Sequence, residues 1–327
     1  MNSRFKLILL SLIILTVFTN ANAQSYEDVI KAFNEGYQLV KDSKSAEAKV
    51  KFFEVIKMSD AVGEQANEIK KKAGDQIPPL QYKIAAAIYK NKDVVGSIVA
   101  FQEAFELAIK FGNKQIEGKA KDIIPKLYFS LGNAAFKKED MENAVSNYKK
   151  ALELNPNYSS VYYQLGLVEK IANNIELALE NFDKAIEIGL ATRDNNSARQ
   201  AEQAARDYLV YVGSKEIEAK RFNKAIELLN KAIQYDNEFA ETYYRLSLAN
   251  NKKAVFDLAV EYANKALQFE KGGKTDRAKV WFELGYAYKN QGNVNAACEA
   301  YEQASFGQFK TVAQHEIEFE LKCKKAN

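Results

Sequence analysis

Few residues of this chain could carry out chemistry. His315 is the single histidine, and Cys298 and Cys323 are the two cysteines. The stretch HEIEF, which begins at His315, starts like the helix of a zinc protease but lacks the second histidine that would complete a metal site. One histidine and two cysteines are too few to form a catalytic triad or a metal cluster. We therefore expect no enzyme activity, no metal site and no cofactor.

The first residues have the layout of an export signal. Arg4 and Lys6 precede the apolar run LILLSLIILTVF (7–18), and Ala21-Asn22-Ala23 offers small residues for a cleavage site. The run is shorter than the roughly 20 residues that a membrane-spanning helix needs. We predict a signal peptide over residues 1–23 and a periplasmic or secreted mature chain, with an uncleaved anchor as the alternative.

Export would place the two cysteines in an oxidising compartment, where pairing is favoured. We therefore expect a disulfide between Cys298 and Cys323. Two buried free thiols are the alternative.

Charge and composition narrow the class of protein. The formal net charge of +3 falls closer to zero once Arg4 and Lys6 are removed, which argues against a nucleic-acid binder. No other segment is apolar enough to cross a membrane. Ala, Glu, Lys and Leu dominate, and strand-like alternation is absent, so the chain should be all-helical. About 300 residues exceed one ordinary core, which requires two domains or a core that grows by repetition.

Small residues recur at a fixed interval. Gly132 and Gly166 lie 34 residues apart, as do Ala144 and Ala178, and WFELGYAY (281–288) has the spacing W-x2-L-G-x2-Y. In these features the chain resembles the tetratricopeptide-repeat family over essentially its whole mature length. The resemblance implies an all-α fold, an α-solenoid with a right-handed superhelix, built from about seven helix pairs and a C-terminal capping helix.

We number the residues of each repeat unit from 1 to 34. The predicted units are 29–62, 78–111, 125–158, 159–192, 206–239, 240–273 and 278–311. Position 8 is small in every unit: Gly36, Ala85, Gly132, Gly166, Gly213, Ser247 and Gly285. Small residues there let the two helices of a unit approach closely, and Pro156 should end the second helix of the third unit.

The segments between the units are polar and favour helix. We interpret 63–77, 112–124 and 193–205 as extensions of neighbouring helices rather than loops, and 309–325 as the capping helix. No stretch has the Gly, Ser and Pro content of a flexible linker. The sequence therefore predicts one solenoid over residues 24–327.

The resemblance also implies where a ligand would bind. In this family the first helix of each unit lines a concave groove, and its positions 2, 5, 9, 12 and 13 point into it. The candidate groove residues are Phe33, Tyr37, Tyr82, Tyr89, Phe129, Asn133, Phe136, Lys137, Tyr163, Lys170, Tyr244, Lys252, Phe282, Tyr286 and Lys289. We expect the position-5 aromatics to be dispensable for helix pairing, although an aromatic residue is common there for structural reasons alone.

Aromatic side chains beside lysines suit a peptide with apolar and acidic residues. Some family members grip a C-terminal carboxylate with Lys at position 5 and Asn at position 9; here Asn133 matches, but Phe129 occupies the lysine position. We expect a non-catalytic interaction scaffold that binds an extended peptide or helix of other envelope proteins, and no nucleic acid. The alternative is an accessory or regulatory subunit of an envelope assembly, secretion or carbohydrate-handling complex, since aromatic rings also stack on sugars.

Overall fold

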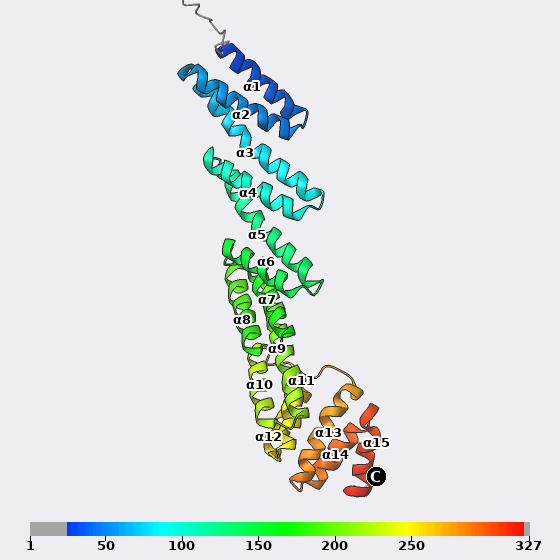
Figure 1. The fold of residues 1–327 in the computed structure, drawn as a ribbon. Coiled ribbons are helices and arrows are strands. Elements are labelled where there is room, and N and C mark those ends of the chain that lie inside the picture. Colours follow the sequence, from blue (N-terminus) through cyan, green and yellow to red (C-terminus); the bar gives the residue numbers. More distant parts are fainter. Residues whose placement is uncertain (1–24, 324–327) are drawn as a thin grey trace, which may run out of the picture. The chain divides into compact units, whose positions relative to one another are not determined.

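The computed structural model describes residues 25–323, and all regular structure within them is helical (Figure 1). This confirms the all-α solenoid class. Two compact units divide the chain, Met1–Leu127 and Tyr128–Asn327, and the boundary falls inside α5 (Lys114–Phe136). The signal peptide predicted over residues 1–23 lies outside the described residues. The continuity of one solenoid through both units and its right-handed superhelix stay predictions.

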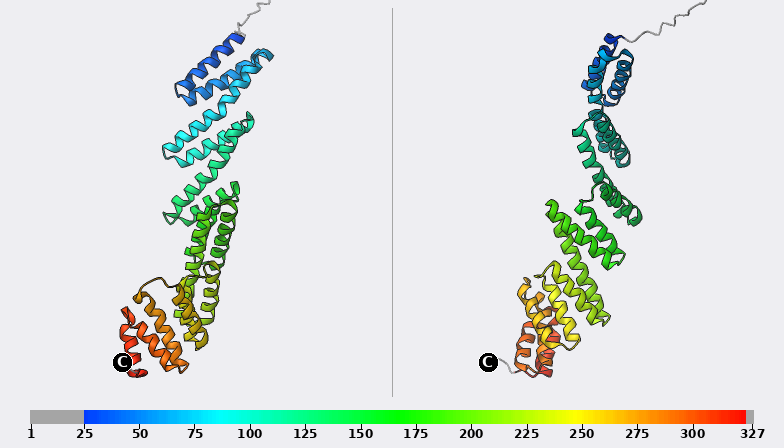
Figure 2. Two further views of the ribbon diagram at one scale, coloured as in Figure 1. Left: turned by 180° about the vertical axis from the view of Figure 1, so that it is seen from behind. Right: turned by 90° about the vertical axis from the view of Figure 1, so that its left-hand side faces the viewer.

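In the first unit, α1 (Tyr26–Lys41) pairs with α2 (Ser45–Val62), and α3 (Asn67–Lys90) pairs with α4 (Val94–Lys110). The two pairs lie side by side in every view because α2 also packs along α3 (Figures 1 and 2). Phe52, Val55 and Ile77 are fully buried between these helices. The first unit thus has a core of its own.

The second unit repeats the same pairing, with each helix packed on the next along the chain. Its helices after α5 are α6 (Met141–Leu154), α7 (Ser159–Ile171), α8 (Ile175–Thr192), α9 (Asn195–Glu218), α10 (Phe222–Tyr235), α11 (Ala240–Lys252), α12 (Phe256–Phe269), α13 (Lys274–Asn290), α14 (Val294–Ala304) and α15 (Lys310–His315). The first helices of successive repeats, α7, α9, α11 and α13, also contact one another. They therefore form one side of this unit.

Glycine at position 8 brings the two helices of a repeat together. A Cβ on Gly132 would overlap Cε1 of Tyr148, and one on Gly166 would lie 2.5 Å from Cε1 of Phe182. Carbon atoms do not approach this closely, so only glycine lets the ring at position 24 rest on the facing helix. Ala144 and the other small residues that the 34-residue period singles out are likewise fully buried.

Each repeat turns between its helices at position 15. All seven residues there have a left-handed backbone with φ between 59° and 77°: Ser43, Lys92, Glu139, Asn173, Lys220, Ala254 and Gly292. Only one of them is glycine, so the turn is held by its surroundings rather than by its residue type. Where position 16 is Asp or Asn, its side chain caps the second helix in three cases: Asp93, Asp140 and Asn293.

The polar segments between the units are mostly helical. Helices α3, α5 and α9 begin at Asn67, Lys114 and Asn195, inside the segments 63–77, 112–124 and 193–205. Pro78, Pro79 and Pro125 consequently lie within helices rather than at their starts. Pro156 behaves as expected, since α6 ends at Leu154 just before it.

The C-terminal cap differs from one continuous helix. Helix α15 gives way at Glu316 to a π-helical turn, Glu316–Glu320. Ala313, Ile317 and Leu321 pack against the core that contains Tyr301 of α14. The wider turn keeps these three side chains on that core, and the chain then reaches the disulfide at Cys323 two residues after Leu321.

Replacing Gly132 with alanine should destabilise the protein by about 1–3 kcal/mol, because the new methyl group must displace the ring of Tyr148. Gly118 of the same helix is the matched control. Outside its own stretch of helix, no heavy atom lies within 4 Å of the position that a methyl group would take, so Gly118→Ala should stabilise by about 0.5–1 kcal/mol. Urea unfolding followed by circular dichroism measures both changes, and equal effects of the two substitutions would contradict the close-packing account.

Candidate functional site

Helix α13 shows how the first helix of a repeat uses its three faces. Trp281, Leu284 and Tyr288 pack on the core beneath α11 and α12, whereas Phe282 and Gly285 meet Tyr301 of α14. The remaining stripe is Lys279, Glu283, Tyr286 and Asn290. We call this stripe, and its equivalents on the other first helices, the open face. It is the side of such a helix that a ligand could reach.

The aromatic residues at position 5 lie at the edge of the core rather than in a free groove. Five of the six rings pack on the position-24 ring of the same repeat. The centroid distances are 5.5 Å for Phe33–Phe52, 5.0 Å for Tyr82–Phe101, 6.0 Å for Phe129–Tyr148, 6.2 Å for Tyr163–Phe182 and 5.4 Å for Phe282–Tyr301. The expectation that these side chains are dispensable for helix pairing is therefore wrong. In four of these repeats they cover a ring that a position-8 glycine admits from the other side: Phe52, Tyr148, Phe182 and Tyr301.

Two other candidates are already occupied within the chain. The hydroxyl of Tyr148 donates a hydrogen bond to Oδ1 of Asn133 at 2.8 Å. Lys289 forms ion pairs with Glu316 at 2.6 Å and Glu320 at 3.4 Å, both from the C-terminal cap. The amide oxygen of Asn133 and the ammonium group of Lys289 therefore already have partners within the chain.

Tyr244 is also withdrawn from the surface. It is only 9% exposed and belongs to the apolar core cluster around Leu246. The charged groups of Arg245 and Lys279 lie 5.1 Å and 4.9 Å from its ring centroid. Burial raises the pKa of its hydroxyl to about 12. Tyr244 contributes to the floor of the open face rather than to its surface.

Other candidates do reach solvent. In the first unit Tyr37 and Tyr89 are 47% and 46% exposed, and Nζ of Lys41 lies 5.2 Å from the ring centroid of Tyr37. In the second unit Tyr286 is 36% exposed. The remaining candidates of that unit divide by burial: Lys137 and Lys252 are exposed, and Phe136 and Lys170 are half-buried. The structure thus leaves tyrosine and lysine, rather than the position-5 row, as the accessible part of the predicted site.

The sequence prediction missed a polar group at position 6 and its neighbours. Arg245, at position 6, donates a hydrogen bond to Glu241, at position 2, over 2.7 Å. Glu241 also forms an ion pair of 2.5 Å with Lys279, at position 2 of the next repeat. Nearby, Asn251 of α11 donates to Glu283 of α13. Position 6 is not among the groove positions that the family resemblance implies, although it lies one turn from positions 2 and 9 on the same face.

The residues that could do chemistry lie at the C-terminal end. Cys298 of α14 and Cys323 form a disulfide with Cα atoms 5.8 Å apart. His315 is exposed, and its Nε2 lies 3.7 Å from a carboxylate oxygen of Glu320. No group of three or more potential metal ligands occurs between residues 25 and 323. Over the same range, no helix combines the length and apolar character that a membrane crossing requires.

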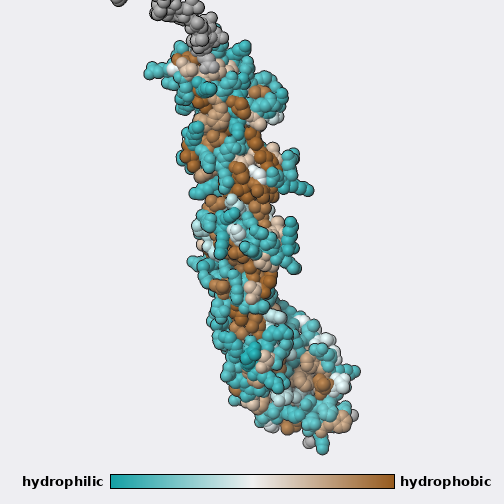
Figure 3. Space-filling model, viewed as in Figure 1, coloured by the Kyte–Doolittle hydropathy of each residue, from teal (hydrophilic) through white to brown (hydrophobic). Residues whose placement is uncertain are grey.

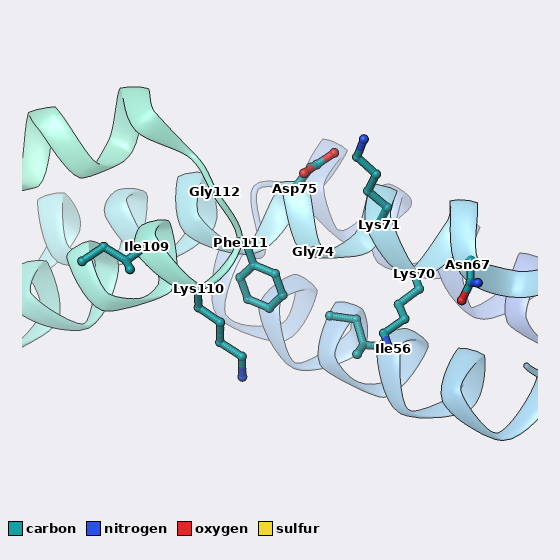
Figure 4. Close-up of a pocket in the computed structure, with 10 residues that line it drawn as sticks. All are labelled: Ile56, Asn67, Lys70, Lys71, Gly74, Asp75, Ile109, Lys110, Phe111 and Gly112. Atoms are coloured by element: carbon teal, nitrogen blue, oxygen red, sulfur yellow. The ribbon is translucent and has the colours of Figure 1, made fainter. Parts of the chain in front are cut away.

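The first unit has a separate cavity of about 540 Å³ at the ends of α3 and α4 (Figure 4). Its apolar floor includes Ile56 and Phe111, whose ring lies against Gly74. Lys71 and Asp75 extend away from this ring, and Lys70 pairs with Asp60 outside the cavity lining (Figure 4). No buried polar side chain faces the cavity among those that line it, so nothing there specifies a ligand.

Comparison with known families agrees with the repeat pattern. A family model of the TPR repeat matches residues 132–170, and a model of the tetratricopeptide repeat matches 159–188 and 278–305. These segments fall in the third, fourth and seventh predicted units. No curated protein sequence matches the chain.

Solved structures with similar folds include three examples. MamA from Desulfovibrio magneticus RS-1 is 19% identical, covering 60% of this chain and 97% of that one, with a TM-score of 0.36. YrrB, described as a TPR protein with an unusual peptide-binding site, is 20% identical (63% and 97% covered, TM-score 0.37). The TPR2AB domain of yeast Sti1 in complex with pHSP90 is 17% identical (91% and 98% covered, TM-score 0.32). At these values the three structures carry no inference about what this chain binds.

Replacing Phe129 with alanine should lower the free energy of unfolding by about 2 kcal/mol, because its half-buried ring packs on Tyr148 and, at 5.1 Å, on Tyr158. Tyr286→Ala is the matched control on an open face and should cost less than about 1 kcal/mol. Urea unfolding of both variants tests this difference. If Phe129→Ala leaves the free energy of unfolding unchanged, position 5 is dispensable for helix pairing after all.

Removing the disulfide should loosen the C-terminal cap. It closes a loop with a sequence separation of 25, worth about 3 kcal/mol in the chain-entropy model. In the double variant Cys298→Ser, Cys323→Ser, amide protection over residues 307–323 should fall by about a hundredfold in hydrogen exchange. Protection in α7 should not change, and a cap that keeps its protection would show that packing alone holds it.

Proposed function

Since the chain is a tetratricopeptide-repeat protein, we propose that it is a non-catalytic interaction scaffold of the cell envelope that binds peptide segments of partner proteins. The observation that carries this proposal is the set of tyrosines exposed on first helices beside lysines, above all Tyr37 and Tyr89 in the first unit. The partner segment would lie along these open faces as an extended chain or a helix.

The physical properties of these side chains support binding. Tyrosine offers a large ring with few rotatable bonds to order, and its hydroxyl remains able to hydrogen-bond. Tyr37 and Tyr89 lie on α1 and α3, which contact each other within the first unit. Lys41 and Lys90, both exposed, end the same helices and would attract acidic residues of a partner.

Apolar side chains are also exposed away from the first helices. Apolar side chains reach solvent between polar ones in both units (Figure 3). Val50, Val95 and Val99 are each more than 60% exposed on the second helices of the first unit. Singly exposed apolar groups of this kind are ordinary on protein surfaces, so these valines serve as a reference for the tyrosines on the first helices.

Two features support location in the envelope. Residues 1–23 have the layout of a signal peptide. The Cys298–Cys323 disulfide is of a kind that persists in oxidising compartments and is rare in the cytosol.

The proposal is tested by capture of partners from envelope extracts with the purified chain and with the double variant Tyr37→Ala, Tyr89→Ala. Both rings are nearly half exposed, so the unfolding transition should barely move. Loss of two aromatic anchors should weaken binding of a captured protein by about tenfold or more.

The matched control is Val50→Ala, Val99→Ala, which removes exposed apolar groups from α2 and α4. It should leave the capture unchanged. If the valine variant loses the partner and the tyrosine variant keeps it, the second helices carry the binding surface instead. A soluble sugar that displaces the partner would favour a carbohydrate-handling role.

A further inference from the structure

The carboxylate of Glu283 occupies an unusual place on the open face of α13. Its neighbours on that face are Lys279 one turn before it and Tyr286 one turn after it. The side chain is half-buried between α13 and α11, two first helices that contact each other. Glu283 is therefore only partly covered by the helices around it.

Asn251 of α11 is the hydrogen-bond partner of Glu283. Its Nδ2 donates to Oε2 of Glu283 at 2.7 Å and to the backbone oxygen of Glu283 at 2.9 Å. Asn251 is only 3% exposed, and its Oδ1 has no hydrogen-bond partner within the described part of the chain. Two hydrogen bonds from one buried amide therefore fix the position of the Glu283 carboxylate relative to α11.

No cation balances this carboxylate. Within residues 25–323, Glu283 takes part in no ion pair. Glu241 on the open face of α11 makes a useful contrast, since Arg245 and Lys279 both contact it. The carboxylate of Glu241 is thus neutralised by ion pairs within the protein, whereas that of Glu283 is not.

The surroundings make this imbalance costly. Burial raises the pKa of the Glu283 carboxyl, and the hydrogen bond from Asn251 and the nearby Lys252 only partly oppose that rise. The hydroxyl groups of Tyr244 and Tyr301 are also close enough to interact with this carboxyl. A buried carboxylate without a cation is poorly stabilised, so a positive group delivered by a ligand would gain a strong interaction there.

We propose that Glu283, held in place by Asn251, forms a subsite for a basic residue, lysine or arginine, of the bound peptide. The subsite rests on the proposed peptide-binding function and adds its chemistry: a carboxylate for an ammonium or guanidinium group. Tyr286, exposed on the same face, offers its ring to the aliphatic stem or the cationic end of the same side chain. A partner would then present a basic residue to α13.

The test begins with a phage-displayed library of random peptides selected on the purified chain. Peptides that bind should share a lysine or arginine at one position, and Glu283→Gln should lower their affinity by about tenfold or more. Gln keeps an acceptor for Asn251 while removing the charge. Glu299→Gln, an exposed carboxylate on α14 of the same repeat, is the matched control and should have no effect.

A double-mutant cycle then assigns the contact. One selected peptide is synthesised with its basic residue and with the neutral counterpart, citrulline for arginine or norleucine for lysine. If the basic residue contacts Glu283, each single change weakens binding, and the second change adds little to the first. Additive losses would place the basic residue elsewhere and overturn the subsite.

The outcomes separate this inference from the function on which it rests. Peptides selected without a basic residue, or unaffected by Glu283→Gln, would refute the subsite and leave the scaffold function intact. Selection of no peptide at all would refute both. Carboxyl carbon NMR gives an independent readout, since the selected peptide should lower the pKa of Glu283 and the neutral counterpart should not.

Discussion

The contact between a position-8 glycine and a position-24 ring is the constraint on which the rest of the structure depends. Tyr148 and Phe182 reach the backbone of the facing helix because Gly132 and Gly166 have no Cβ. This approach fixes how the two helices of a repeat are rotated about their axes. It thereby determines which side chains of the first helix enter the core and which stay on the open face.

The same contact explains why aromatic residues at position 5 serve the fold. Phe129 and Tyr163 close over rings that glycine admits from the opposite side, so each position-24 ring is enclosed. Side chains farther around the helix, such as Tyr286 and Glu283, are then left on the open face. In the proposed function, the ligand chemistry would vary at these open-face positions while the core stays the same.

The C-terminal cap shows how the end of a repeat stack is completed. No further repeat follows α14 within the described residues, so the core around Tyr301 is covered by Ala313, Ile317 and Leu321. The disulfide ties the far end of the cap to α14, and Glu316 neutralises Lys289. The cap therefore supplies both the apolar cover and the charge that a following helix pair would otherwise provide.

The sequence by itself determined the repeat period, the helix pairs and the small residues at their contacts. Closely packed helices need small side chains where they touch. A glycine or alanine that recurs every 34 residues is therefore visible in the sequence, as Gly132, Gly166 and Ala144 are. The tertiary structure alone decided that Phe129 belongs to the core, that Lys289 is paired, and that Glu283 is held by Asn251 without a cation. Each of these depends on a neighbour from another helix, and the spacing of residues along one helix does not identify that neighbour.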